Sequence, residues 1–100
     1  MRRSNDVALA LKAARILDGD ITPLQLELLM RLRIAGAYGT SQSSLVDDTG
    51  ATEASVSRSL KKLREGRLAS SRHDLFDKRN RMIVITDSGL RMCKIILGET

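Results

Sequence analysis

The sequence predicts a mainly α-helical fold with one small β-hairpin near its carboxyl end. Apolar segments with helical spacing are each preceded by a Ser or Thr cap and followed by glycine. After Gly66 the spacing changes to two short strands around a polar turn. One hundred residues, 42% of them hydrophobic and 29% charged, fit a single globular domain over residues 1–100.

The first expected helix runs from a cap at Ser4 or Asn5 to Leu17, and Gly19 ends it. Its apolar side chains surround most of the helix instead of forming one stripe. A helix that is buried on several sides needs more partner surface than so small a domain offers. The pattern therefore indicates a second subunit.

The second expected helix has a well-marked start. Thr22 is its cap, Pro23 takes the first helical position and Gln25 completes a capping box. Apolar residues continue to Ile34, and Gly36 then breaks the pattern. We therefore expect a helix between Pro23 and Gly36.

Two shorter segments form a helix-turn-helix. Ser41 caps a third helix, which runs to about Asp48 and stops at Gly50. Thr52 caps a fourth helix, and three of its apolar positions are spaced for one buried face: Val56, Leu60 and Leu63. Two short helices joined through a glycine, the second with a polar face, are typical of this motif.

The last third of the chain changes from strands back to helix. We expect strands at Leu68–Arg72 and Met82–Thr86, joined by a polar tip from His73 to Arg81. Thr86 then caps a final helix that ends near Leu97. This helix, residues 87–97, and the first, about residues 5–18, are the expected dimer contacts.

The positive charge lies in one segment of the chain. Residues from Arg58 to Arg81 include nine of the seventeen Lys and Arg and three acids, a net +6, whereas the whole chain carries +5. That segment covers the fourth helix and the hairpin. A polar helix followed by a basic hairpin is the electrostatic pattern of a protein that reads duplex DNA.

The fourth helix has the features of a recognition helix. Its small polar residues Ser55 and Ser57 allow close approach, and Arg58 is long enough to reach a guanine edge. Lys61 and Lys62 are better placed for phosphates. An ordinary solvated helix face is the alternative interpretation, and the adjoining basic hairpin favours DNA.

Five short motifs, in this order and spacing, resemble the winged helix-turn-helix of MarR-type transcription regulators. They are Ser41–Leu45, Thr49–Gly50, Ser55–Arg58, Asp77–Arg79 and Ile85–Gly89. The resemblance covers roughly residues 21–89. Two positions depart from the family pattern: Thr49 stands where an apolar residue is usual, and Asp87 replaces a proline.

The resemblance implies roles for the helix and the hairpin. The helix of residues 52–65 would enter the major groove, and the wing of residues 68–86 would lie at the minor groove, with Arg79 reaching into it. Asp77 would brace the wing by pairing with Arg79 or Arg81. The expected DNA contacts are Ser41, Gln42, Thr52, Ala54, Ser55, Ser57, Arg58, Lys61, Lys62, Arg72, Lys78, Arg79 and Arg81.

The expected partners are double-stranded DNA and a second copy of the chain. Members of the family that it resembles usually continue through longer terminal helices that frame a ligand pocket. With a last helix that stops near Leu97, the resemblance implies no sizeable pocket for a small-molecule effector. No apolar run is long enough to cross a membrane, and a single cysteine is consistent with the cytoplasm. We expect a transcription regulator, and repression is the commoner action of such proteins. The alternative is a protein-interaction module that keeps this fold without binding DNA.

Other side chains receive structural interpretations. No nucleophile–base pair, zinc spacing or phosphate-binding glycine loop is present, so we expect no catalytic residue, metal or cofactor and no enzyme. Cys93 is expected to pack in a core or interface, with a redox role as the minor alternative. His73 would contact phosphate or solvent. Phe76 would anchor the wing against the body, with a wedge between base steps as its alternative.

Overall fold

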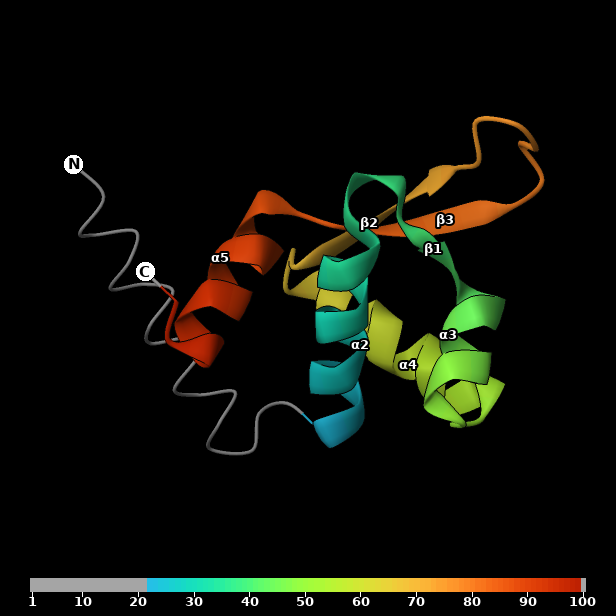
Figure 1. Ribbon diagram of the computed structural model, residues 1–100. Helices are drawn as coiled ribbons and strands as arrows, with labels where there is room; N and C mark the ends of the chain where they lie inside the picture. The colour runs from blue at the N-terminus through green and yellow to red at the C-terminus, as the bar shows by residue number, and fades with distance from the viewer. Residues whose placement is uncertain (1–21, 100) are drawn as a thin grey trace.

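The computed structural model describes residues 22–99, which form four α-helices and a three-stranded sheet (Figure 1). The first expected helix, between Ser4 and Leu17, lies outside the described residues, and so does its part in a dimer. None of the helices in residues 22–99 is long and apolar enough to cross a membrane. The elements follow in the order α2 (Pro23–Ala35), a 3₁₀ turn (Gly36–Tyr38), β1 (Thr40–Ser41), α3 (Gln42–Thr49), α4 (Glu53–Glu65), β2 (Ala69–His73), β3 (Arg81–Ile85) and α5 (Asp87–Leu97).

Each of the four helices begins where its capping residue predicts. At the start of α2, the Gln25 amide donates to the Thr22 hydroxyl at 3.1 Å, and the Thr22 amide donates to the Gln25 side chain at 3.2 Å. Such a capping box satisfies two amides that the helix itself leaves without partners. α3, α4 and α5 are capped by the hydroxyls of Ser41, Thr52 and Thr86, each of which accepts one amide of the first turn.

The helices pack around a leucine-rich core. In Figure 1, α2 lies between α5 and α3, and α4 runs behind it. Completely buried side chains come from α2, α3, α4 and α5, and the sheet adds Ile83. Because α2 contributes to every part of this cluster, it acts as the central support on which α4 and α5 rest. The core residues are Leu28, Leu29, Leu32, Leu45, Val56, Leu60, Leu63, Leu68, Ala69, Ile83, Met92 and Cys93.

The hairpin is present, and its strands are displaced by one residue from the predicted bounds. β2 pairs antiparallel with β3, from Ala69 opposite Ile85 to His73 opposite Arg81. Leu68 was predicted to start the first strand, but its amide instead closes the end of α4 by donating to the Leu63 carbonyl at 2.9 Å. The wing therefore leaves the helix one residue later than expected.

The third strand and the 3₁₀ turn were not predicted from the sequence. β1 is only two residues long and pairs antiparallel with β3, so the strand order is β1-β3-β2. Gly39 precedes β1 with φ of 76°, and a Cβ at this position would lie 2.5 Å from the Ile83 carbonyl oxygen. A residue without a side chain is thus required where the backbone crosses close to the sheet.

The turn from α4 into β2 is closed by backbone hydrogen bonds. Arg67 donates its amide to the Arg64 carbonyl at 2.9 Å, alongside the bond from Leu68 to Leu63. This is a Schellman arrangement, in which the left-handed position usually belongs to glycine. Here Gly66 keeps φ of −79° and Arg67 takes the left-handed conformation, with φ of 61°. The turn fixes where the wing begins relative to the end of α4.

Thr86 connects this turn to α5. Thr86 donates its hydroxyl to the Arg67 carbonyl at 2.7 Å and accepts the Gly89 amide at 3.0 Å. Its own amide donates to the Leu68 carbonyl at 3.2 Å. The cap of α5 is therefore built onto the residues that end α4.

Candidate nucleic-acid interface

The polar face of α4 is turned to solvent, as the helical spacing predicts. Val56, Leu60 and Leu63 are buried against the core, whereas Ala54, Ser57, Arg58, Lys61 and Lys62 are exposed. Ser55 is half-buried on the flank. Ser59, which was not predicted as a buried residue, is also buried and lies on the side of the helix towards α2.

The amino end of α4 is ordered by short polar side chains. Ser55 donates its amide to the Thr52 hydroxyl at 3.1 Å, and the two hydroxyls are 2.9 Å apart. Arg58 reaches back to the Ser55 hydroxyl at 3.4 Å, which is long for a hydrogen bond. Its guanidinium is therefore held loosely and can turn to an outside acceptor.

The helix-turn-helix accommodates a polar residue at the position where the MarR-type pattern is apolar. Thr49 donates its hydroxyl to the Leu45 carbonyl at 2.7 Å, and Ala51 donates its amide to that hydroxyl at 3.3 Å. Gly50 follows with φ of 71°, the left-handed conformation that closes α3. Thr49 is thus satisfied within the turn and brings no unpaired polar group into it.

At the start of α3, the two predicted contacts, Ser41 and Gln42, are half-buried. Ser41 already uses its hydroxyl as the helix cap, where it accepts the Ser44 amide at 3.1 Å. It also lies 3.0 Å from the Ser44 hydroxyl. Their contact with DNA stays a prediction.

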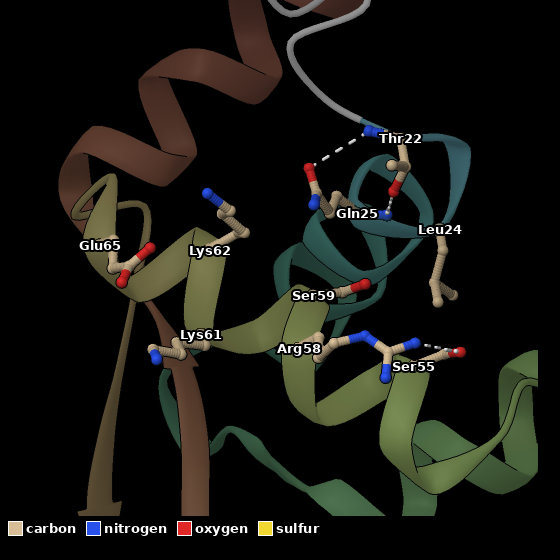
Figure 2. Close-up of a pocket in the computed structure, with 9 residues that line it drawn as sticks. All are labelled: Thr22, Leu24, Gln25, Ser55, Arg58, Ser59, Lys61, Lys62 and Glu65. Atoms are coloured by element: carbon tan, nitrogen blue, oxygen red, sulfur yellow. Dashed lines mark hydrogen bonds between the residues drawn. The ribbon is translucent and has the colours of Figure 1, made fainter.

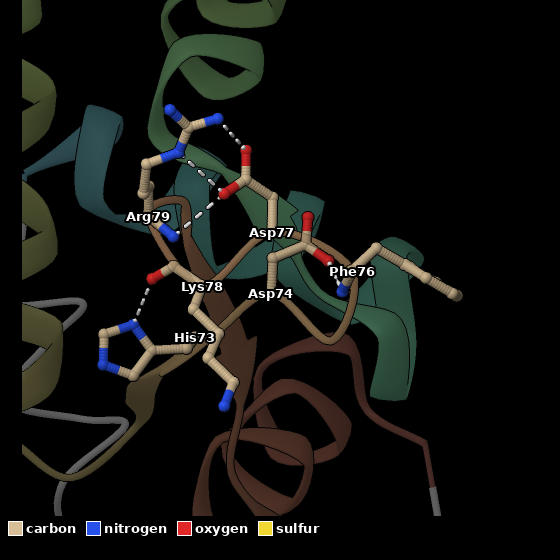
Figure 3. Close-up of polar contacts among 6 residues, drawn as sticks. All are labelled: His73, Asp74, Phe76, Asp77, Lys78 and Arg79. Carbon is tan, nitrogen blue, oxygen red and sulfur yellow. Dashed lines mark hydrogen bonds and ion pairs between the residues drawn. The ribbon is translucent and has the colours of Figure 1, made fainter.

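The wing tip is held by hydrogen bonds among its own residues (Figure 3). Asp77 accepts the Arg79 amide at 3.1 Å and the Arg79 guanidinium at 3.1 and 3.4 Å. Asp74 accepts the Phe76 amide at 2.9 Å, and the His73 ring nitrogen Nδ1 lies 2.8 Å from the Lys78 carbonyl oxygen. These bonds order a loop whose residues 74–80 include no buried side chain.

Of its two expected partners, Asp77 pairs with Arg79. Arg81 contacts the Ser71 hydroxyl instead, at 3.3 Å. The Arg79 side chain, and next the Arg79 amide, lower the pKa of the Asp77 carboxyl below its ordinary value of 3.8. The Arg79 side chain remains 90% exposed. It is thus aligned by one carboxylate and still presents its cation to solvent.

Arg72 is engaged within the protein. Its guanidinium donates to the Tyr38 carbonyl at 2.7 Å and to the His73 carbonyl at 3.1 Å, so it joins the wing to the turn before β1. A guanidinium has five donors, and two carbonyls leave some of them open. Its contact with DNA stays a prediction, and its contact with Tyr38 is a structural one.

The expected anchoring of Phe76 was wrong. Phe76 is 94% exposed, and Figure 3 shows it pointing away from Arg79 on the other side of the tip. The Phe76 amide donates to the Asp74 carboxylate within the tip, and the ring itself stays in solvent.

Within residues 22–99, no group of three or more His, Cys, Asp or Glu residues could hold a metal ion. Cys93 is completely buried in the core, and this burial raises the pKa of its thiol.

The exposed cations of the charged segment are divided between two structural parts. Five lie on α4 or in the turn that ends it, and three lie in the wing. Arg72 is half-buried and belongs to neither set. The exposed cations are Arg58, Lys61, Lys62, Arg64, Arg67, Lys78, Arg79 and Arg81.

A helix-turn-helix formed by α3 and α4, followed by a β2–β3 hairpin and supported by α2, defines a winged-helix domain. The sequence matches no protein-family model and no curated protein. Solved structures of MarR-family transcription regulators, however, share this winged-helix fold.

Three of these structures illustrate the likeness. A variant of MepR from S. aureus, bound to an oligodeoxyribonucleotide, matches with a TM-score of 0.76 and 25% identity over 96% of this chain and 70% of that chain. Tm0710 from Thermotoga maritima gives 0.72 and 21% over 97% and 68%. BpsR from Bordetella bronchiseptica, whose DNA binding is regulated by 6-hydroxynicotinic acid, gives 0.73 and 23% over 96% and 66%.

Proposed function

We propose that this protein is a transcription regulator that binds specific sequences in double-stranded DNA. In this proposal α4 enters the major groove, and the wing lies against the minor groove. The observation that carries it is the solvent-exposed face of α4, where Ser57, Arg58 and Lys61 stand clear of the core next to a basic wing. The shared fold with a MepR variant bound to an oligodeoxyribonucleotide supports it.

Within this proposal each exposed group has a physical role. A guanidinium such as that of Arg58 can donate two hydrogen bonds to the O6 and N7 atoms of a guanine. Lys61 and Lys78 would neutralise phosphates and release counterions, which makes binding salt-dependent. Arg79 would enter the minor groove, where negative potential is strongest in narrow A·T-rich segments.

We further propose a homodimer that acts as a repressor in the cytoplasm and has no enzymatic activity. Two-fold symmetry would require two half-sites about one helical turn (~34 Å) apart. A protein bound across such a site occludes a promoter by its bulk, and this is the simplest route to repression. The solved structures that it resembles are regulators, which supports a role other than catalysis.

Selection of bound duplexes from a random pool tests the proposal. An enriched pseudo-palindrome with half-sites one helical turn apart is the expected result, followed by a steep loss of affinity as salt rises. Weak binding to every duplex across the salt series would instead identify a protein-interaction module that has kept the fold.

A further inference from the structure

An open groove of about 640 Å³ lies between the amino end of α2 and one flank of α4 (Figure 2). The lining from α2 and its cap includes Thr22, Leu24 and Gln25, and the lining from α4 includes three cations and one acid. The groove shares Arg58 and Lys61 with the exposed face of α4. The α4 residues that line it are Ser55, Arg58, Ser59, Lys61, Lys62 and Glu65.

Ser59 is the unusual residue in this groove. It is only 7% exposed, and it is the one buried polar side chain among the described residues. No hydrogen bond joins its hydroxyl to another residue in the range 22–99, although the hydroxyls of Thr49, Thr52 and Ser55 all have partners there. Figure 2 shows the Ser59 hydroxyl directed across the groove towards Leu24. No buried side-chain oxygen or nitrogen of the described residues lacks a partner, so the Ser59 oxygen itself opens onto the groove, where it can bond to water or to a ligand.

The surroundings of Ser59 suit an oxyanion. The amino end of a helix carries a partial positive charge, and the groove contains that end of α2. The capping box occupies the amides of Thr22 and Gln25, and Pro23 has none, so Leu24 supplies the remaining first-turn amide. On the opposite wall, Lys62 lies one helical turn from Ser59 and adds a full positive charge.

We propose that this groove binds a phosphate of the DNA backbone that flanks the major groove in which α4 lies. This inference rests on the proposed function. A helix in the major groove has a sugar-phosphate strand on each side, and the amino end of α2 lies beside one flank of α4. The Ser59 hydroxyl and the Lys62 ammonium donate to the phosphate oxygens, and the amino end of α2 faces the same group. Leu24 lies against the adjoining sugar.

The contact fixes how α4 sits in the groove. Contacts to phosphates set the orientation of a reading helix without carrying sequence information themselves. In this proposal residues of α2 and α4 together bind one phosphate beside α4, and the wing makes a second contact with the DNA at the other end of the domain. Binding strength that is common to all sequences therefore comes in part from α2, outside the recognition helix and the wing.

The test compares four proteins on the duplex selected from the random pool, each over a series of salt concentrations. Lys62→Gln should make the slope of log affinity against log salt shallower by about one, because one counterion fewer is released. Arg31→Gln removes one positive charge from α2, outside the groove and the expected dimer helices, and should keep the wild-type slope. Ser59→Ala should keep the slope and weaken binding roughly three- to tenfold, the effect of one lost hydrogen bond.

A second measurement locates the phosphate. Duplexes in which one phosphate at a time is replaced by a neutral methylphosphonate should reveal a position that weakens the wild type but leaves Lys62→Gln unaffected. The inference is overturned if Lys62→Gln keeps the full salt slope and responds to every methylphosphonate as the wild type does. A wild type with no steep salt dependence would instead refute the proposed function itself.

Inorganic phosphate distinguishes a free anion from the DNA backbone. If the groove serves a free anion, phosphate added without duplex should shift the amide resonances of Ser59 and Lys62 at low millimolar concentration, and the slope for Lys62→Gln should stay unchanged. That pair of results would overturn the assignment to DNA. Amide shifts that need the duplex, together with the shallower slope, would support it.

Discussion

Helix α4 and the wing tip are stabilised in different ways, although both present exposed cations. Val56 and Leu60 fix α4 to the core, where both are completely buried. The wing tip, residues 74–80, has no buried side chain and depends on the carboxylates of Asp74 and Asp77. The position of α4 is thus coupled to the stability of the whole domain, whereas the conformation of the wing tip depends on hydrogen bonds among its own residues.

The largest expected effect comes from breaking the support of α4. Leu60→Ala should lower the free energy of unfolding by about 2–5 kcal/mol, because it leaves a cavity in the core. Lys61→Ala, one residue further along the same helix, should change it by less than about 0.5 kcal/mol, since Lys61 is exposed. Urea unfolding followed by circular dichroism measures both. Equal losses would show that α4 is not held from behind.

Next in size is the base contact proposed for α4. Arg58→Ala should weaken binding to the selected duplex by about 1–3 kcal/mol and spare unrelated DNA, as expected for a lost hydrogen-bond pair with a guanine. Competition between the selected and a scrambled duplex gives both affinities. A parallel loss on the two duplexes would assign Arg58 to a phosphate.

A smaller change is expected at the wing. Arg79→Ala should reduce affinity a few-fold where the flanking DNA is A·T-rich and less where it is G·C-rich, because the narrow groove concentrates negative potential. Duplexes that differ only in their flanks measure the dependence. Thermal unfolding should be nearly unchanged, since the Arg79 side chain is 90% exposed. If the flank preference survives the substitution, Arg79 does not enter the minor groove.

The smallest effect is the response of the wing to acid. Arg79 lowers the pKa of Asp77, so the ion pair is complete at neutral pH and is lost only as the pH falls through this lowered value. The amide resonance of Arg79 should therefore stay constant across neutral pH and shift below pH 3.8. Asp77→Asn removes the titrating group and should abolish the transition. A midpoint above the ordinary value would contradict the pairing.

Features that depend on local sequence could be predicted, and features that depend on distant contacts could not. Helix caps and buried stripes are local patterns, and Thr22, Ser41, Thr52 and Thr86 begin their helices as expected. β1 contains two residues, too few for an alternating pattern, and it exists only because β3 pairs with it. Local spacing therefore gives the order of elements and misses a strand that depends on a distant partner.

The candidate site was predictable only where it depends on one helix. Arg58 and Lys61 follow from the periodicity of α4, and the structure places them on its exposed face. Ser59 has the spacing of a core residue, and its relation to Leu24 arises only when α2 packs against α4. Arg72 was indistinguishable from the other wing cations until its bond to the Tyr38 carbonyl was seen.

Thr86 links α5 to the turn between α4 and the wing. Its hydroxyl caps α5 and also holds the Arg67 carbonyl in the turn between α4 and the wing. A shift of α5 would therefore act directly on the residues that join α4 to the wing. In the proposed homodimer, contacts between the last helices of the two subunits would, through this linkage, also affect the distance between their two DNA-facing surfaces.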